Sequence, residues 1–239
     1  EVPPTAGLSR AELNARGHIL LAEVLWTAAW LPRHEPEDYA RAGQRLFRVL
    51  AHGLMAPGAA WPTEAAAAPT DPFDGGDDPA EMFLRAATEL INEEGYIGAS
   101  VEKISARLNL TKGAFYHHIP TKDDLVAACF DRTFEVMRRA LREAEAASSS
   151  GLEALVRLAS SLVGHQLRGG APLLRTSALT SVPEALQPQL LAKFDRISGR
   201  FASLISDGIA DGSIRPVDVN IAAQALTAMI NAAAELRHW

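Results

Sequence analysis

The sequence of 239 residues has a single cysteine, Cys129, and few aromatic side chains. One cysteine excludes a disulfide within these residues and a zinc cluster built from several cysteines. The apolar runs are also short, because Glu23 interrupts the stretch 19–30, and Gln224 and Asn231 interrupt the run near the C-terminal end. None reaches the roughly 18–20 residues that a membrane-spanning helix needs. The sequence opens without a basic, cleavable leader, and we therefore expect a cytoplasmic protein with no membrane contact.

Signatures of catalysis are missing as well. The sequence has no nucleophile elbow, phosphate-binding loop, dinucleotide fingerprint or His-Glu-x-x-His motif. We therefore expect neither an enzyme nor a cofactor. A net charge of −6 argues against a protein that coats nucleic acid through its overall charge, although a small local basic site stays open.

Strand patterns are almost absent, whereas apolar residues recur at helical spacing along the chain, and this predicts an all-α fold. In the N-terminal part we expect a helix near 11–33 and another over 36–54. Further helices are expected over 79–94, 100–108, 111–117, 121–146, 152–168, 172–180, 184–211 and 218–237. Residues 56–77 are rich in proline, glycine and aspartate, and we interpret them as a linker between two folded parts.

The two ends of the chain resemble each other. The stretch from Ala11 aligns without gaps with the stretch from Val217, so that Leu226 falls on Leu20 and Ile230 on Val24. If the repeat is real, residues 1–55 are the tail of one module, the rest is a second copy without its own tail, and the chain is a fragment of a tandem protein. The alternative is an unrelated N-terminal helical hairpin, and the sequence leaves both interpretations open.

Residues 99–125 predict a short helix, a tight turn, a second short helix and the start of a long one, which is helix-turn-helix geometry. Asn109 is suited to the left-handed conformation of the turn. Four basic residues in this window, Lys103, Arg107, Lys112 and Lys122, outnumber the single acid Glu102 that precedes Asp123. Such a local excess of positive charge is what phosphate contact requires.

Particular side chains in this window suit contacts to a duplex. Ser100 and Thr111 offer helix caps with free amides that bind anions. Lys112 lies where it can reach a base edge, most naturally guanine, and Gly113 leaves room for close approach of the backbone. Tyr116 and His117 are candidates for phosphate contacts. Adjacent helical positions point about 100° apart, so His117 and His118 are not expected to share a metal.

The run Thr111-Lys112-Gly113-Ala114-Phe115-Tyr116-His117-His118, followed by Pro120-Thr121-Lys122-Asp123-Asp124-Leu125, resembles the TetR family of bacterial regulators. The resemblance covers about 80–127. Ile119 stands where the family usually has Phe, and Asp74, Asp77 and Asp78 stand where it often has basic residues. The resemblance implies operator contacts by Thr111, Lys112, Tyr116, His117 and Lys122. It also implies a helical domain that binds an effector and dimerises through its last two helices.

We therefore predict a helical hairpin over 1–55, a linker over 56–77, a helix-turn-helix DNA-binding domain over 78–125 and an effector-binding and dimerisation domain over 126–239. The expected function is a ligand-responsive repressor that binds double-stranded operator DNA and is released by a small hydrophobic effector. It would act as a homodimer or as a pseudo-dimer within one chain. The alternative is a helical adaptor of the same fold that has lost DNA binding and acts through protein contacts.

The effector site is predicted from apolar side chains of the C-terminal part. The candidate pocket residues are Phe134, Leu158, Leu162, His165, Leu179, Phe194 and Phe201. The same residues are equally compatible with a plain hydrophobic core. We expect Cys129 to be a small core residue, and Trp26, Trp30 and Trp61 to anchor the packing of the N-terminal part.

Overall fold

The computed structural model describes residues 7–67, 79–109, 120–168, 172–175, 178–179 and 182–236. Over these ranges the regular structure is helical, apart from an isolated antiparallel bridge between Met55 and Ile214. The α-helices are α1 (Arg10–Trp30), α2 (Tyr39–His52), α3 (Thr63–Ala67), α4 (Pro79–Gly98), α5 (Val101–Arg107), α7 (Lys122–Ala146), α8 (Gly151–Arg168), α9 (Gln187–Ala210) and α10 (Val219–Leu236). Two short 3₁₀ turns, Leu31–Arg33 and Pro36–Asp38, connect α1 to α2. The predicted all-α fold is confirmed.

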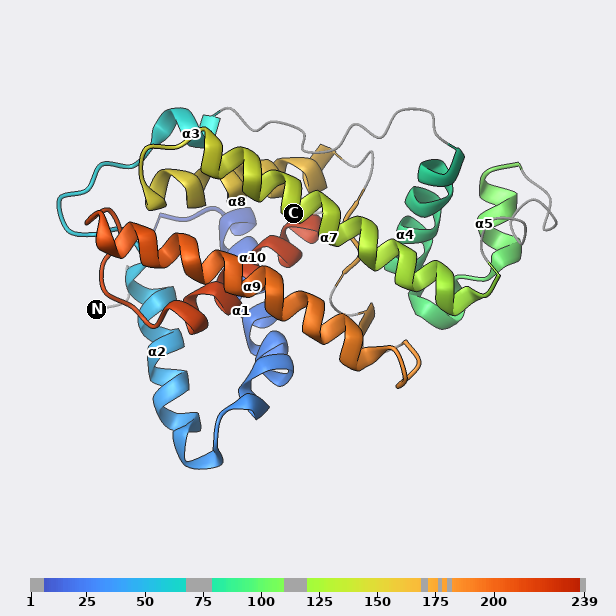
Figure 1. The fold of residues 1–239 in the computed structure, drawn as a ribbon, viewed down its shortest axis with the longest axis horizontal. Helices are drawn as coiled ribbons and strands as arrows, with labels where there is room; N and C mark the ends of the chain where they lie inside the picture. Colours follow the sequence, from blue (N-terminus) through green and yellow to red (C-terminus); the bar gives the residue numbers. More distant parts are fainter. Residues whose placement is uncertain are drawn as a thin grey trace.

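One end of the elongated molecule, at the right of Figure 1, is built from α4, α5 and the start of α7. We call residues 79–125, of which 79–109 and 120–125 are described, the helix-turn-helix unit. Regular helix in α4 breaks at Gly95, whose φ of 73° is a conformation that glycine adopts without strain. Ser100 caps α5 by accepting from the Lys103 amide, and Thr121 caps α7 by accepting from the Asp124 amide. Both predicted caps and the predicted stop at Gly95 are therefore present.

A helical bundle of α7, α8, α9 and α10 forms the body of the molecule (Figure 1). Its interior is apolar, with Phe130, Phe134 and Phe201 completely buried. The helices α8 and α9 approach each other closely at two glycines. A Cβ built on Gly151 would lie 2.2 Å from the backbone nitrogen of Gly208, so the crossing depends on a position without a side chain.

The helix predicted over 172–180 is wrong for residues 172–175, which form a segment without regular secondary structure that is buried over 172–174. Side chains of the neighbouring helices satisfy the backbone polar groups that a helix would otherwise pair internally. Asn92 on α4 donates to the Leu173 carbonyl at 2.9 Å and accepts from the Arg175 amide at 2.9 Å. Thr133 on α7 accepts from the Leu174 amide at 2.9 Å. These partners are distant in sequence, and the local pattern therefore gave no indication of them.

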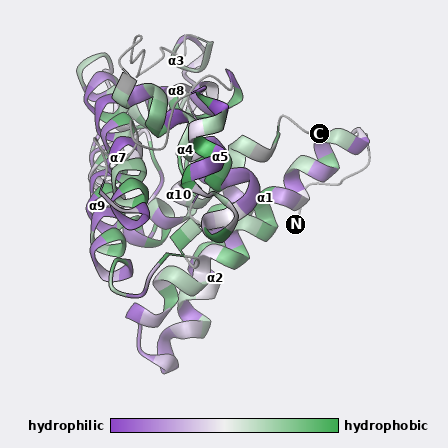
Figure 2. Cartoon of the chain, turned by 90° about the vertical axis from the view of Figure 1, so that its right-hand side faces the viewer, coloured by the Kyte–Doolittle hydropathy of each residue, from purple (hydrophilic) through white to green (hydrophobic). Residues whose placement is uncertain are grey.

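The helices α1 and α2, which we call the N-terminal hairpin, pack against α10 of the bundle. The adjacency of α1 and α10 is visible in two perpendicular views (Figures 1 and 2). Trp26 and Trp30 are buried at this contact, as expected, whereas Trp61 is 57% exposed and its predicted anchoring role is wrong. The segment predicted as a linker contains α3, which packs on α8 through the buried Ala65.

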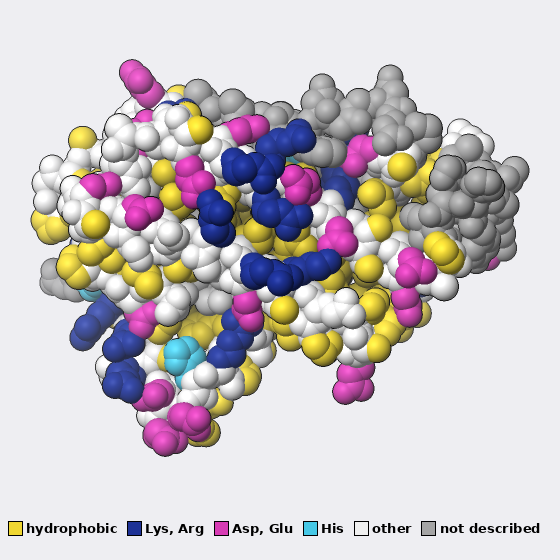
Figure 3. All heavy atoms as spheres, viewed as in Figure 1, with side chains coloured by type: hydrophobic (Ala, Val, Ile, Leu, Met, Phe, Trp, Pro, Cys, Tyr) yellow, Lys and Arg dark blue, Asp and Glu magenta, His cyan; other side chains and the backbone are white. Residues whose placement is uncertain are grey.

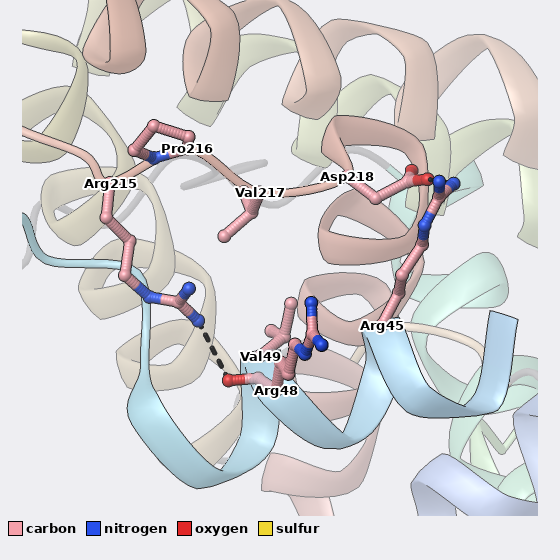
Figure 4. Close-up of a pocket in the computed structure, with 7 residues that line it drawn as sticks. All are labelled: Arg45, Arg48, Val49, Arg215, Pro216, Val217 and Asp218. Carbon is pink, nitrogen blue, oxygen red and sulfur yellow. Dashed lines mark hydrogen bonds and ion pairs between the residues drawn. The ribbon is translucent and has the colours of Figure 1, made fainter. Parts of the chain in front are cut away.

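A second contact joins the end of α2 to the segment before α10 (Figure 4). Arg215 donates to the carbonyl oxygens of Gly53 and Arg48, both at 2.8 Å, and Arg45 forms an ion pair of 2.5 Å with Asp218. An open cavity of about 380 Å³ lies between these side chains. Both helices of the N-terminal hairpin thus contact the bundle, α1 along α10 and α2 at the segment before α10.

Candidate nucleic-acid interface and effector region

The turn of the helix-turn-helix unit begins as the sequence predicts. Val101 and Ile104 face the interior and are buried, and Asn109 has the left-handed φ of 55°. Five of the predicted DNA-binding residues, Thr111, Lys112, Gly113, Tyr116 and His117, fall in 110–119, outside the described residues. Ser100 and Lys122 are described, and they lie at the N-terminal ends of α5 and α7.

The expected excess of positive charge is partly cancelled by the fold. Lys103 forms an ion pair with Glu94, and Arg107 pairs with Glu93 at 3.0 Å and approaches Glu89 to 3.8 Å. These acids lie on α4, outside the window from which the charge was counted. The charge argument from residues 99–125 is therefore corrected: two of its four cations are already paired with acids of α4.

Lys122 is held in a partly buried position at the junction of α4 and α7. Its ammonium lies 4.4 Å from the centre of the Tyr96 ring and donates to the Ile97 carbonyl at 3.3 Å. Burial lowers the pKa of Lys122, although Asp123 and Glu102 act in the opposite direction. Tyr96 donates to Asp123, and burial together with this carboxylate raises the pKa of Tyr96 to about 12. These contacts fix the start of α7 on the kinked end of α4.

A buried ion pair connects the helix-turn-helix unit to the bundle. Arg132 on α7 donates to Glu81 on α4 at 2.6 Å and to the carbonyl of Pro172 at 3.0 Å. Both side chains are almost completely buried, and Glu81 also accepts from Arg85 at 3.0 Å. The beginning of α4, the middle of α7 and the irregular segment 172–175 are thereby joined at one point.

The predicted effector-pocket residues come together in the interior of the bundle. Phe134, Leu158, Leu162, His165, Leu179, Phe194 and Phe201 are all buried. The rings of Phe134 and Phe194 contact edge to face, with centroids 4.8 Å apart. The structure thus confirms that these residues lie in the interior, whereas their role in binding a ligand stays a prediction.

The sequence analysis missed the part that the N-terminal hairpin takes in this region. The Trp26 ring lies 5.6 Å from that of Phe194, and its indole N–H donates to Gln224 on α10 at 3.0 Å. Polar groups continue along the same helix, where Thr227 lies 3.3 Å from Ser198 on α9. The two tryptophans and Glu23, spaced three and four residues apart, were the only local signal that α1 buries this face.

Glu23 is buried on the same side of α1 as Trp26. Its side chain is 1% exposed, and neither carboxylate oxygen has a hydrogen-bond partner among the described residues. Burial disfavours the charged form and raises the pKa of Glu23 to about 8. Cys129 is also fully buried, as expected, and burial raises the pKa of its thiol to about 12.

The basic surface over α7 and α9 does not form a continuous cationic patch. Figure 3 shows lysine and arginine side chains gathered on this face among acidic ones. Arg138 and Arg142 both pair with Glu135, and Arg200 pairs with Glu145 at 2.7 Å. Among the described residues, no group of His, Cys, Asp and Glu is placed to hold a metal. None of the described helices is long and apolar enough to cross a membrane.

The helix-turn-helix unit and the bundle both match family models. The model described as "Bacterial regulatory proteins, tetR family" matches residues 83–129, and that described as "Tetracyclin repressor-like, C-terminal domain" matches residues 148–235. Together they cover more than half of the chain. A helix-turn-helix unit carried on a helical bundle is the architecture of a one-component regulator, and this chain belongs to the TetR family.

Individual relatives agree with this assignment. The chain is 40% identical over 50 residues to the Transposon Tn10 TetC protein of Escherichia coli, a match of 21% of this chain and 25% of that protein. It is 26% identical over 138 residues to the transcriptional repressor DhaR of Mycobacterium sp. strain GP1, which covers 56% of this chain and 69% of DhaR. The chain thus matches only a quarter of the length of TetC.

Among solved structures, AibR in complex with isovaleryl coenzyme A and operator DNA superposes with a TM-score of 0.53 at 21% identity. The superposition covers 68% of this chain and 87% of AibR. At this identity the likeness shows the fold. Neither family model reaches the N-terminal hairpin, whose residues all precede the first match.

Proposed function

We propose that this protein is a ligand-responsive transcriptional repressor of the TetR family that acts on double-stranded operator DNA in the cytoplasm. The observation that carries the proposal is the helix-turn-helix unit itself, with capped helices, a left-handed Asn109 at the turn and a match to the family's DNA-binding model. The DNA contacts are assigned to Ser100, Thr111, Lys112, Gly113, Tyr116, His117 and Lys122. No enzymatic activity or cofactor is assigned to the chain.

The proposed coupling between effector and DNA runs through α7. This helix begins in the helix-turn-helix unit at Lys122 and ends in the bundle at Ala146. A ligand that separates the aromatic rings of Phe134 and Phe194 would move α7 relative to α9, and with it the start of α7. Such a ligand shifts the population between two spacings of the DNA-reading helices in a dimer or pseudo-dimer. The buried, apolar lining supports a hydrophobic effector.

The assignment of roles is tested with two lysine variants. Lys122→Ala should weaken binding to operator and random DNA alike and reduce the salt slope by about one, because it removes one phosphate contact. Lys112→Ala should in addition reduce the preference for operator over random DNA. Arg41→Ala, at an exposed position of α2 outside the helix-turn-helix unit, is the control and should leave both affinities unchanged. Equal losses of operator and random binding in both lysine variants would refute the division of roles.

A second function has one observation in its favour. The ion pairs of Lys103 and Arg107 with acids of α4 reduce the charge available to phosphates. This supports a helical adaptor that keeps the family fold and acts through protein contacts. An adaptor would show no salt-dependent, sequence-selective DNA binding, and that property separates the two functions.

A further inference from the structure

Helix α1 is apolar on two opposite sides, and α10 covers only one of them. Trp26 and Trp30 lie on the covered side and are 6% and 3% exposed. The opposite side carries large apolar residues that are 41–68% exposed, which we call the α1 stripe: Leu13, Leu20, Leu21, Val24 and Leu25. A helix that is apolar all round is typical of a helix buried on every side, and a contiguous exposed apolar patch marks an interaction surface.

The internal repeat identifies what covers such a stripe in this fold. In the gap-free alignment of α1 with α10, Leu21 corresponds to Thr227 and Val24 to Ile230. On α10 these two positions are 0% and 2% exposed, because α10 packs on α8 and α9. Leu13, Leu20 and Leu25 align with Val219, Leu226 and Asn231, which are only half-buried. Gln166 on α8 donates to the Ile230 carbonyl, and the Thr227 hydroxyl lies 3.3 Å from that of Ser198 on α9.

The small residues of the two helices agree with the same correspondence. Gly17 and Ala28 on the exposed side of α1 align with Ala223 and Ala234 of α10. Ala223 and Ala234 are 1% and 4% exposed, and small side chains at these positions allow the helices of the bundle to approach closely. No side chain lies within 4 Å of a Cβ built on Gly17. The middle of the bare side of α1 therefore corresponds to the side by which α10 closes its own bundle.

We propose that α1 and α2 are the closing helices of a second effector-binding bundle, carried in the same polypeptide ahead of α1, and that its equivalents of α8 and α9 cover the α1 stripe. A second copy of this chain does not supply such a pair, because its own α8 and α9 are already closed by α10. The contact between α1 and α10 is then the interface between two like bundles of one polypeptide.

The proposal is tested by the accessibility of a thiol placed on the α1 stripe. Val24→Cys puts a cysteine at its centre, and Cys129, the one cysteine of residues 1–239, is fully buried. The same polypeptide without the substitution is labelled alongside, so that thiols outside these residues are subtracted. Ala60→Cys, in the exposed loop after α2, is the matched control. Each variant is prepared twice, as the polypeptide that the native gene produces in its host and as residues 1–239 alone. Labelling by a maleimide is then timed under native conditions.

We expect the new thiol of the Val24→Cys variant to react at least tenfold more slowly in the native polypeptide than in residues 1–239, while the control thiol reacts equally in both. We also expect the native polypeptide to exceed 25.6 kDa, the mass of these residues. Leu20→Cys is a second probe on the stripe, and circular dichroism verifies that each variant is folded.

Two results would overturn the proposal outright: equal labelling of the Val24→Cys variant in both preparations, or a native mass of 25.6 kDa. Slow labelling of residues 1–239 alone, together with a dimer on light scattering, would overturn it in favour of a second copy of the chain. The proposal rests on the family fold, but DNA binding is not measured here. This test and that of the proposed function therefore fail independently.

Discussion

The indole N–H of Trp26 on α1 donates a hydrogen bond of 3.0 Å to the side-chain oxygen of Gln224 on α10. The same tryptophan contacts Phe194 edge to face, so one residue of the N-terminal hairpin meets both α10 and the aromatic interior of the bundle. The hairpin is thus part of the hydrophobic core that surrounds the predicted effector pocket. Changes at this contact are expected to affect the stability of the whole bundle.

Trp26→Ala should lower the free energy of unfolding by about 3–5 kcal/mol, because it leaves a large cavity and removes the partner of a buried amide. Denaturant unfolding followed by circular dichroism measures the change. Trp61→Ala is the control and should cost less than about 1 kcal/mol, because Trp61 is largely exposed. Equal losses for the two variants would contradict the buried contact between α1 and α10.

Glu23 should make the stability of the protein fall as the pH rises. Its pKa in the folded protein is about 8, whereas the ordinary value is 4.5, so the folded state holds a proton that the unfolded state has lost. The contribution is complete below about pH 4.5 and disappears as the pH rises to about 8, at most about 1.4 kcal/mol per pH unit. Glu23→Gln should remove this component.

The measurement is the difference in unfolding free energy between wild type and Glu23→Gln at several pH values. The unfolding free energy of the variant, relative to that of the wild type, should increase as the pH increases from about 5 to about 8. Glu37→Gln, an exposed change on the same hairpin, should keep the wild-type profile. A difference that is constant over this range would show that Glu23 is ionised in the folded protein.

Removing one partner of the buried ion pair between Arg132 and Glu81 should lower the free energy of unfolding substantially. Arg132→Met leaves the buried Glu81 with Arg85 as its one ion-pair partner among the described residues and removes the donor to the Pro172 carbonyl, and we expect a loss of about 3–5 kcal/mol. Replacing both partners, by Arg132→Met with Glu81→Leu, should recover part of this loss. Arg200→Met breaks an exposed pair and should cost at most about 1 kcal/mol. Thermal unfolding of the wild type and these variants measures the changes. A double variant that is the least stable of the set would contradict the account.

Gly151→Ala should destabilise the crossing of α8 and α9, because the new Cβ would meet backbone atoms of Gly208 and Leu204 at 2.2–2.6 Å. We expect a loss of roughly 1–3 kcal/mol, typical of overpacking. Gly43→Ala on α2 meets nothing within 4 Å and should stabilise by about 0.5–1 kcal/mol through helix propensity. A neutral Gly151→Ala variant in chemical denaturation would show that the helices can separate at this point.

Local signals in the sequence predicted the features that depend on neighbouring residues. The caps at Ser100 and Thr121, the break at Gly95 and the left-handed Asn109 each follow from the chemistry of one turn, and each is present. The irregular segment 172–175 was missed because its partners, on α4 and α7, lie about 80 and 40 positions earlier in the chain. The ion pairs of the α5 cations with α4 were missed for the same kind of reason, since charge counted along a window ignores acids that the fold brings across.

The sequence predicted the α1 stripe only in part. The alignment of α1 with α10 is a property of the sequence, but it does not say which side of α1 is covered. That information comes from the burial of Trp26 and the exposure of Val24 in the structure. The roles of the predicted pocket residues and of the lysines at the DNA stay predictions that rest on the family fold.

The central claim, that the helix-turn-helix unit binds operator DNA selectively, is tested most directly by fluorescence anisotropy. The purified protein is titrated into labelled DNA from its own upstream intergenic region at several salt concentrations, with a shuffled duplex of equal length as the competitor. The account predicts tight binding that weakens linearly in log affinity against log salt, together with at least a thousandfold preference for the upstream DNA. Equal affinity for the two duplexes, or no binding at low salt, would contradict it.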